Sequence, residues 1–166
     1  LHRTHASLWV NHAVAERGLG RPEAAAESLG RARSAYSDAG VEVINADFYI
    51  ALGNTRADSG DVTGAASAYR QALDNARLRD TPGVEGTALS NLSWAAERLS
   101  DYEAAESYLI ESENLRRRIG DDVGLIRSKI RRANLLFHRG RLNDADAVAE
   151  AVLQDSYALT EPDLQS

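Results

Sequence analysis

The sequence predicts an all-α solenoid, built from four antiparallel helix hairpins with eight helices in total. The first observation is an internal repeat, because similar stretches begin at Gly20, Gly60, Ser100 and Gly140, at intervals of 40 residues. Each stretch has an alanine at its sixth position: Ala25, Ala65, Ala105 and Ala145. The second observation is helical spacing of apolar residues, with no alternating strand pattern. A single hairpin cannot bury its own apolar face, so neighbouring hairpins must stack to form a core.

The first hairpin is expected to pair helices near residues 3–17 and 22–38. Gly18 and Gly20 interrupt the helical pattern between them, as helix ends require. Pro22 fits the first turn of the second helix, where its missing N–H costs nothing.

The second hairpin is expected to pair helices near residues 42–58 and 62–79. Gly60 separates the two helices. Asp61 follows it, and a side-chain carboxylate at this place is a favoured N-cap.

The third hairpin is expected to pair helices near residues 83–99 and 102–118. Pro82 fits a first turn, and Asp101 is a second candidate N-cap, directly after Ser100. The second helix carries one apolar or small face, formed by Tyr102, Ala105, Leu109, Ser112 and Leu115.

The fourth hairpin is expected to pair helices near residues 123–139 and 142–157, around Gly140. Lys129 and Arg132 replace residues that are apolar in other repeats, so we expect its first helix to be shifted or partly exposed. The sequence therefore predicts one domain over residues 1–158 and a C-terminal tail over 159–166. The four repeats within it are approximately 1–40, 41–80, 81–120 and 121–158.

Small residues recur where the two helices of a hairpin should touch. Twelve positions before each recurrent alanine stand Ala13, Gly53, Ser93 and Ala133. We expect each small residue to face the alanine of its hairpin, so that the helices pack closely. Four positions after each alanine, larger residues fill the space towards the next hairpin, with Ala149 as the exception: Leu29, Tyr69, Leu109 and Ala149.

The residues at these positions resemble the tetratricopeptide repeat. The second unit carries the pattern most fully, with Tyr49, Leu52, Gly53, Gly60-Asp61, Ala65, Tyr69 and Ala72. The third unit matches at Leu89, Leu92, Ser93, Ala105 and Leu109, and the first at Trp9, Ala13, Ala25, Leu29 and Ala32. The period of 40 is similar to a longer-helix variant of the usual repeat of about 34 residues. Residues 114–136 are similar to repeat arrays of large bacterial signalling ATPases and transcriptional regulators.

The resemblance implies a right-handed solenoid whose first helices line a concave groove. It places groove contacts at two positions of each first helix, and four asparagines stand there: Asn11, Asn54, Asn91 and Asn134. An asparagine offers both a donor and an acceptor, so such a row suits the backbone of an extended peptide. The alternative is that they are ordinary polar residues on a solvated face.

Trp94 and three arginines stand among these asparagines. Trp94 either projects into the groove as an anchor or packs between the second and third hairpins. Arg98, Arg127 and Arg131 supply positive charge, and the last two are spaced to bind a carboxylate or phosphate of a partner. The alternatives for this pair are a solvated face or a contact with a neighbouring domain.

The charge distribution argues against nucleic acid as a partner. The chain has 19 basic and 25 acidic residues, a net charge of −6. Residues 116–141 are locally basic, but the region is short and lacks interleaved aromatic residues apart from Phe137. No apolar run is long enough for a membrane helix. The absence of cysteine makes a reducing, cytoplasmic compartment the default expectation.

No motif predicts catalysis, a metal site or a cofactor. His5 and His12 are seven residues apart on one helix, which separates them by about 10 Å, too far for one ion. The carboxylates lie on predicted outer helix faces, and none forms an evident catalytic pair. We therefore expect a protein that is not an enzyme.

The predicted function is protein–protein recognition, with a peptide or helix of a partner, including an acidic segment, held in the groove. Because the chain begins with Leu1, we expect a fragment of a larger bacterial signalling or regulatory protein. One alternative is a structural arm that self-associates through uncapped ends, where Val148, Val152 and Leu153 are expected to be uncovered. Another is a ligand-sensing module of a transcriptional regulator.

Overall fold

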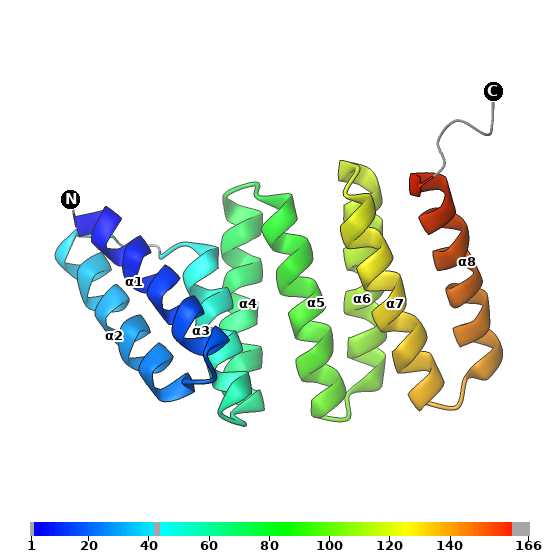
Figure 1. Ribbon diagram of the computed structural model, residues 1–166, viewed down its shortest axis with the longest axis horizontal. Helices are drawn as coiled ribbons and strands as arrows, with labels where there is room; N and C mark the ends of the chain where they lie inside the picture. The colour runs from blue at the N-terminus through cyan, green and yellow to red at the C-terminus, as the bar shows by residue number, and fades with distance from the viewer. Residues whose placement is uncertain (1, 42–43, 161–166) are drawn as a thin grey trace.

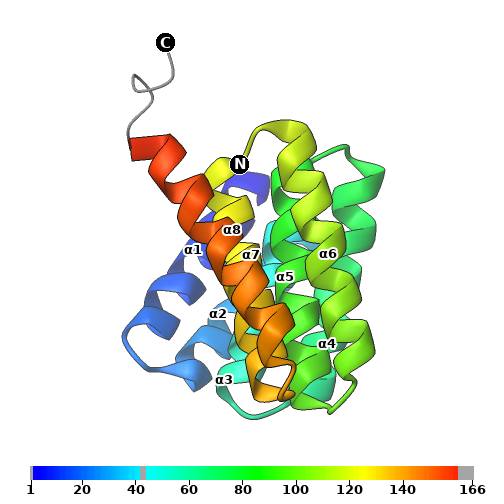
Figure 2. The same cartoon turned by 90° about the vertical axis from the view of Figure 1, so that its right-hand side faces the viewer.

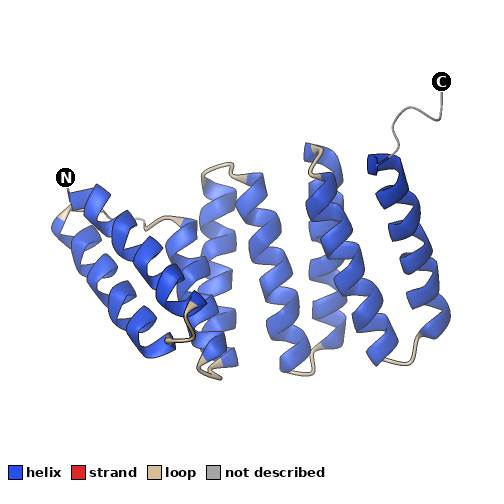
Figure 3. Ribbon diagram, viewed as in Figure 1, coloured by secondary structure: helices blue, strands red, loops and turns tan. Residues whose placement is uncertain are grey.

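The fold is an α-solenoid of four helix hairpins. The computed structural model describes residues 2–41 and 44–160, and all regular structure among them is helical (Figures 1 and 3). The hairpins follow one another in a row from the N-terminal to the C-terminal end (Figure 1). In chain order the helices are α1 (His2–Gly18), α2 (Pro22–Asp38), α3 (Ala46–Asp58), α4 (Val62–Leu78), α5 (Pro82–Arg98), α6 (Tyr102–Ile119), α7 (Asp122–His138) and α8 (Leu142–Thr160).

The odd-numbered helices form the inner row of the array. α1 contacts α3, α3 contacts α5 and α5 contacts α7, whereas no comparable contact joins consecutive even-numbered helices. Each hairpin also packs through its own two helices, and α4 and α6 pack against the odd helix that follows. Because the odd helices approach one another and the even ones do not, the array is concave on the odd side, as the sequence predicted.

A left-handed residue recurs at every turn, at intervals of 20 residues. Most of these residues are glycines, and the full set is Gly20, Gly40, Gly60, Asp80, Ser100, Gly120 and Gly140. The following N–H then bonds back to the preceding helix, as in the 2.9 Å bond from Asp61 N to Arg56 O, which closes a Schellman motif. The Asp61 side chain accepts from Gly64 N at 2.8 Å, and Asp101 caps α6 in the same manner. Both predicted N-caps are confirmed.

The prediction that the third helix starts near residue 42 was wrong. α3 begins at Ala46, and residues 42–43 lie outside the described part of the chain. Asn45 is its N-cap, because Asn45 Oδ1 accepts a hydrogen bond from Phe48 N at 3.1 Å. Asn75 of α4 donates to the backbone oxygen of Ile44 at 2.9 Å, which fixes the chain just before this cap.

The apolar core is largest in the first half of the array. Phe48 packs with Leu29 and Tyr36 in one cluster, and Tyr69 packs with Leu89 in a second that joins α3, α4 and α5. The last two clusters, around α6 to α8, contain fewer buried residues.

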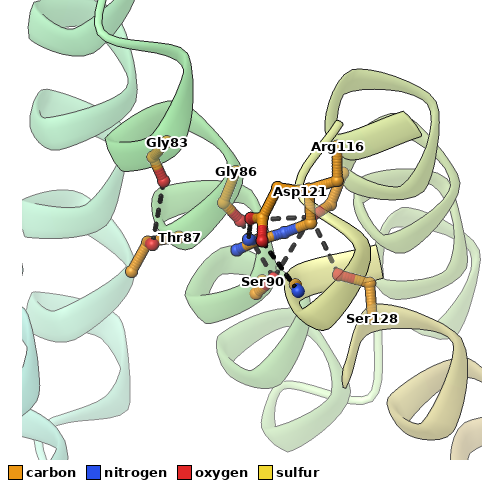
Figure 4. A network of polar contacts seen from close by, with 9 residues as sticks. Gly83, Gly86, Thr87, Ser90, Arg116, Asp121 and Ser128 are labelled. Carbon is orange, nitrogen blue, oxygen red and sulfur yellow. Dashed lines mark hydrogen bonds and ion pairs between the residues drawn. The ribbon is translucent and has the colours of Figure 1, made fainter. Parts of the chain in front are cut away.

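Polar groups link α5, α6 and α7 where the apolar core becomes smaller (Figure 4). Ser112 donates to the Gly86 carbonyl at 3.1 Å, and its hydroxyl lies 3.3 Å from that of Ser90 and 3.0 Å from that of Ser128. All three serines are buried. Because each of their hydroxyls has a partner, this polar seam avoids the cost of unsatisfied buried groups.

The expectation of a shifted or exposed fourth first helix was wrong. α7 spans Asp122–His138, in register with the earlier first helices. Lys129 is buried, and its Nζ donates to Asp155 of α8 at 2.6 Å. Arg132 is half-buried and donates to both oxygens of the buried Glu113 in α6, at 2.7 and 2.9 Å. The two cations occupy core-facing positions because each has a carboxylate partner there.

Candidate ligand-binding groove

The predicted site residues fall on stripes along the inner helices. Asn91, Trp94 and Arg98 lie at spacings of three and four on α5, and Arg127, Arg131 and Asn134 lie at spacings of four and three on α7. Such spacings place side chains on one helix face. Asn54 of α3 and Asn11 of α1 occupy the corresponding parts of their helices.

Asn54 is held in place by a buried tyrosine. The hydroxyl of Tyr69 in α4 donates to Asn54 Oδ1 at 2.9 Å, and Asn54 itself is half-buried. Among the described residues, no acceptor takes the two N–H groups of the Asn54 amide. Burial raises the pKa of the Tyr69 hydroxyl to about 12, so this hydroxyl remains a donor at neutral pH. The geometry therefore fixes the amide and leaves its donor end available to a ligand.

Arg131 is a half-buried cation without a partner. Its guanidinium makes no hydrogen bond or ion pair within the part of the chain that the structure describes. Burial holds the pKa of the Arg131 guanidinium below its usual value, while the nearby charge of Glu97 acts in the opposite direction. Tyr69 is also close enough to interact electrostatically with Arg131. The structure thus brings Arg131, Tyr69 and Asn54 into one neighbourhood.

Trp94 is partly buried, and its ring packs against the core cluster formed by α3, α4 and α5. Asn91, one turn earlier, is half-buried and makes no hydrogen bond within the described ranges. The indole therefore contributes to packing between the second and third hairpins, and part of its surface stays accessible.

The other four candidates are exposed. Asn11 and Arg98 have no recorded contact with the neighbourhood of Arg131. Arg127 lies near the start of α7, where its charge helps to lower the pKa of Asp121. Asn134 lines a cavity between α7 and α8. The interactions of the described residues therefore link Asn54 and Arg131 of the predicted set through Tyr69.

Most of the basic region between residues 116 and 141 is used for internal contacts. Carboxylates of α6 hold two of its members, because Arg139 donates to Glu103 at 2.7 Å and Arg141 donates to Glu106 at 2.7 Å. Of its nine basic residues, three make no hydrogen bond or ion pair among the described residues: Arg118, Arg127 and Arg131. Two of these three are the predicted groove arginines.

Two contacts between successive first helices were not anticipated. Arg17, at the end of α1, donates to Asp58 of α3 at 2.6 Å. His138 of α7 lies 3.5 Å from Glu97 of α5. The repeat offset was the available signal, because each pair joins corresponding ends of successive first helices, 41 residues apart.

Other kinds of site have no support among the described residues. No group of three or more histidine, cysteine or acidic side chains could hold a metal ion there. None of the helices described is both long and apolar enough to cross a membrane. His12, considered above as a metal ligand, instead contacts the Ser28 hydroxyl at 2.9 Å.

Comparison with known proteins supports the fold. No protein-family model matches the sequence, and no curated protein does. Solved structures do match: BtubC (BKLC) from P. vanneervenii has a TM-score of 0.85 at 17% identity, over 93% of this chain and 64% of that one. Aspartyl phosphate phosphatase F from Bacillus subtilis has a TM-score of 0.84 at 14% identity, over 99% of this chain and 43% of that one.

A third similar structure is a Signal Transduction ATPase with Numerous Domains (STAND) protein with a tetratricopeptide repeat sensor, from Pyrococcus horikoshii. Its TM-score is 0.82 at 15% identity, over 93% of this chain and 24% of that one. The chain thus spans less than two thirds of each of these proteins. The fold is that of a tetratricopeptide-like helical-repeat array, as predicted.

Proposed function

We propose that the concave face binds an extended peptide segment of a partner protein, and that a carboxylate of this segment pairs with Arg131. One observation carries the proposal: the Arg131 guanidinium is partly desolvated and makes no hydrogen bond or ion pair among the described residues. A cation in this state gains most from an incoming carboxylate, because arginine forms paired, charge-assisted hydrogen bonds with it. Arg127, one turn earlier, adds a second positive charge.

The asparagines supply contacts that do not depend on the peptide's sequence. Asn91 of α5 and Asn54 of α3 stand on the same inner row of helices as Arg131 of α7, and both amides are suited to pair with peptide backbone groups. Trp94 offers an apolar surface next to them. In this arrangement charge selects the segment and amides hold its backbone.

The test is a peptide array of extended segments with systematically varied acidic positions, probed with the labelled chain. The double variant Arg127→Gln/Arg131→Gln should bind acidic peptides with an affinity about tenfold lower, or weaker still, because a partly buried charge pair is broken. Arg118→Gln is the matched control, since Arg118 is also unpaired but lies on α6, outside the inner row. Retention of the same peptides by the double variant would contradict the proposal.

A second array experiment tests the amides separately. Asn54→Ala/Asn91→Ala/Asn134→Ala should weaken all bound peptides to a similar degree, whatever their charge. A loss confined to a few peptide sequences would mean that the asparagines recognise side chains rather than backbone.

The similarity to the STAND protein favours a wider role, as the sensor portion of a larger signalling protein. In that case occupancy of the groove would be relayed to a separate effector domain. Binding of the same peptides by a longer version of the protein, with a change in its activity, would test this role.

A further inference from the structure

The last hairpin leaves a cavity of about 550 Å³ between α7 and α8. Its walls include apolar and small residues from both helices, with one carboxylate: Ala133, Phe137, Leu142, Ala145, Asp146 and Ala149. Phe137 is 62% exposed and Leu142 is 57% exposed, and Leu153, one turn beyond Ala149, is 56% exposed. Figure 2 shows α8 at the end of the array with none of the described helices over its outer side.

The third hairpin shows what fills the equivalent place one repeat earlier. Forty residues earlier stand the counterparts of the six wall residues: Ser93, Glu97, Tyr102, Ala105, Glu106 and Leu109. In the third hairpin, α7 and the turn that follows it contact several of these counterparts. Leu135 packs with Ala105 and Leu109, His138 lies 3.5 Å from Glu97, and the Arg139 guanidinium lies 5.5 Å from the Tyr102 ring centre. The cavity is therefore the place that a helix occupies at the preceding junction.

Differences between the two junctions define the occupant's side chains. Leu135 packs against Leu109, which is 1% exposed, but the corresponding residue in the cavity is Ala149. A helix docked here needs an anchor larger than leucine to fill the space, which favours tryptophan or phenylalanine.

Charge complementarity sets a second position of the occupant. Glu106 accepts Arg141 at 2.7 Å, and Arg139 lies 3.6 Å from it. Its counterpart Asp146 has no ion pair among the described residues. An arginine one turn after the anchor, placed as Arg139 follows Leu135, would reach Asp146.

A third position must be apolar. In α7, Arg132 stands three residues before Leu135 and pairs with Glu113. The counterpart of Glu113 in α8 is the exposed Leu153. The occupant therefore carries an apolar residue, then an aromatic anchor three residues later, then a basic residue four residues after that.

A second copy of this chain does not fit the pattern. The residues of a second copy that correspond to the three positions are His12 and Ala15 in α1 and Leu19, which follows that helix. Ala15 is too small for the cavity, and Leu19 would oppose Asp146. The tail EPDLQS contains no basic residue. We propose that this end face binds an amphipathic helix that lies outside residues 1–166, with an apolar residue, an aromatic anchor and a basic residue at spacings of three and four.

The test uses two synthetic, conformationally constrained helical peptides that share the apolar and arginine positions and carry either tryptophan or leucine as anchor. Fluorescence anisotropy should show that the chain binds the tryptophan peptide about tenfold more tightly, as expected for a well-packed aromatic anchor. Ala149→Leu should reverse this preference, because the added side chain fills the cavity and leaves room only for leucine. Ala147→Leu, at an exposed position outside the cavity wall, is the control, and this variant should still bind the tryptophan peptide more tightly than the leucine peptide.

The charge position is tested independently. Asp146→Lys should weaken both peptides, and replacing the peptide arginine with glutamate should restore binding to that variant. Arg127→Gln/Arg131→Gln should leave binding of the helical peptides unchanged, which separates this face from the concave groove. The proposal is overturned if neither peptide binds or if Ala149→Leu preserves the order. A dimer of the chain alone, abolished by Asp146→Lys, would also overturn it, since a second copy would then occupy the face.

Discussion

Gly53 is the residue at which the second hairpin has no room for a side chain. A Cβ built there would overlap the ring of Tyr69 and would lie 2.9 Å from its Cζ atom. The sequence predicted that Gly53 faces Ala65, but the nearest atoms across the helix pair belong to Tyr69. The missing side chain lets Tyr69 lie across α3 and reach Asn54, so a packing residue also positions a candidate groove residue.

Gly53→Ala should therefore lower the free energy of unfolding by about 1–2 kcal/mol, because steric overlap outweighs the helix preference for alanine. Urea unfolding followed by circular dichroism would measure the change. Gly30→Ala is the matched control, since a Cβ at Gly30 in α2 meets no atom within 4 Å. The control should be unchanged or more stable by up to about 1 kcal/mol. Equal stabilisation by both substitutions would show that Tyr69 does not pack as described.

Arg131 cannot be told from the neighbouring arginines by sequence, but its contacts in the structure differ from theirs. It is one of nine basic residues in a 26-residue region, and its register in the repeat, with the spacing of four to Arg127, predicted that both residues lie in the groove. The internal contacts of Arg132, Arg139 and Arg141 remove these neighbours from the set of available cations.

At the scale of the helix, the start of α7 depends on Asp121. Its Oδ1 accepts from Gly124 N at 2.9 Å, and its other oxygen pairs with Arg116 of α6 (Figure 4). The backbone hydrogen bond from Gly124, together with Arg116, lowers the pKa of the Asp121 carboxyl below its usual value. The same side chain thus caps one helix and joins it to another.

Asp121→Asn should remove a stabilisation that depends on pH. A carboxyl whose pKa is lower in the folded state stabilises the fold above its unfolded pKa, near 4, and loses this effect as pH falls through the folded value. The stability difference between wild type and Asp121→Asn should therefore be constant from pH 7 to about pH 5 and shrink below about pH 4. Denaturant unfolding at each pH would measure it.

Asp122→Asn is the control for this measurement, because Asp122 is exposed and makes no hydrogen bond or ion pair among the described residues. Its difference from wild type should change much less between pH 5 and pH 3. A constant difference for Asp121→Asn across the acid range would mean that the charge of Asp121 does not stabilise the helix junction.

Across the whole molecule, the means of stabilisation change from one end to the other. α4 and α5 each bury seven or eight residues, and their neighbours cover them on both sides. In α8, over residues 142–157, only Ala145 and Val148 are buried, and α7 is its only extensive partner. The expectation that Val148 is uncovered was wrong, since it packs on Leu136, whereas Leu153 is exposed as expected.

α8 should therefore open first. Native-state hydrogen exchange should show lower protection for α8 than for α4 and α5, because local opening exposes little buried surface. Asp155→Asn breaks the tie to Lys129 and should speed exchange in α8 by about fivefold, the effect of a partly screened ion pair, without changing α4. Equal protection of α4 and α8 in the wild type would contradict this view of the array.

Sequence reasoning predicted the global architecture, and the binding role of the candidate site residues stays a prediction. The regular 40-residue period placed seven of the eight helix starts within about one residue, because turn residues and N-caps act locally. The exception was α3, whose N-cap is Asn45, five residues after the left-handed Gly40, whereas the cap Asp61 follows Gly60 directly. The groove residues could be placed on a helix face by spacing, but spacing carries no information about which of them already have a partner.

The sequence by itself determined the repeat, the hairpins and the position of each turn, because these depend on small residues, left-handed turn residues and caps that act over a few positions. Asp80 and Ser100 adopt the same left-handed backbone conformation as the turn glycines, because they stand at the corresponding helix ends of the repeat. Only the tertiary structure decided which polar groups remain free. Packing between neighbouring helices pairs Tyr69 with Asn54, 15 positions apart, and Glu113 with Arg132, 19 positions apart. The same packing leaves Arg131 and Asp146 without a hydrogen bond or ion pair among the described residues.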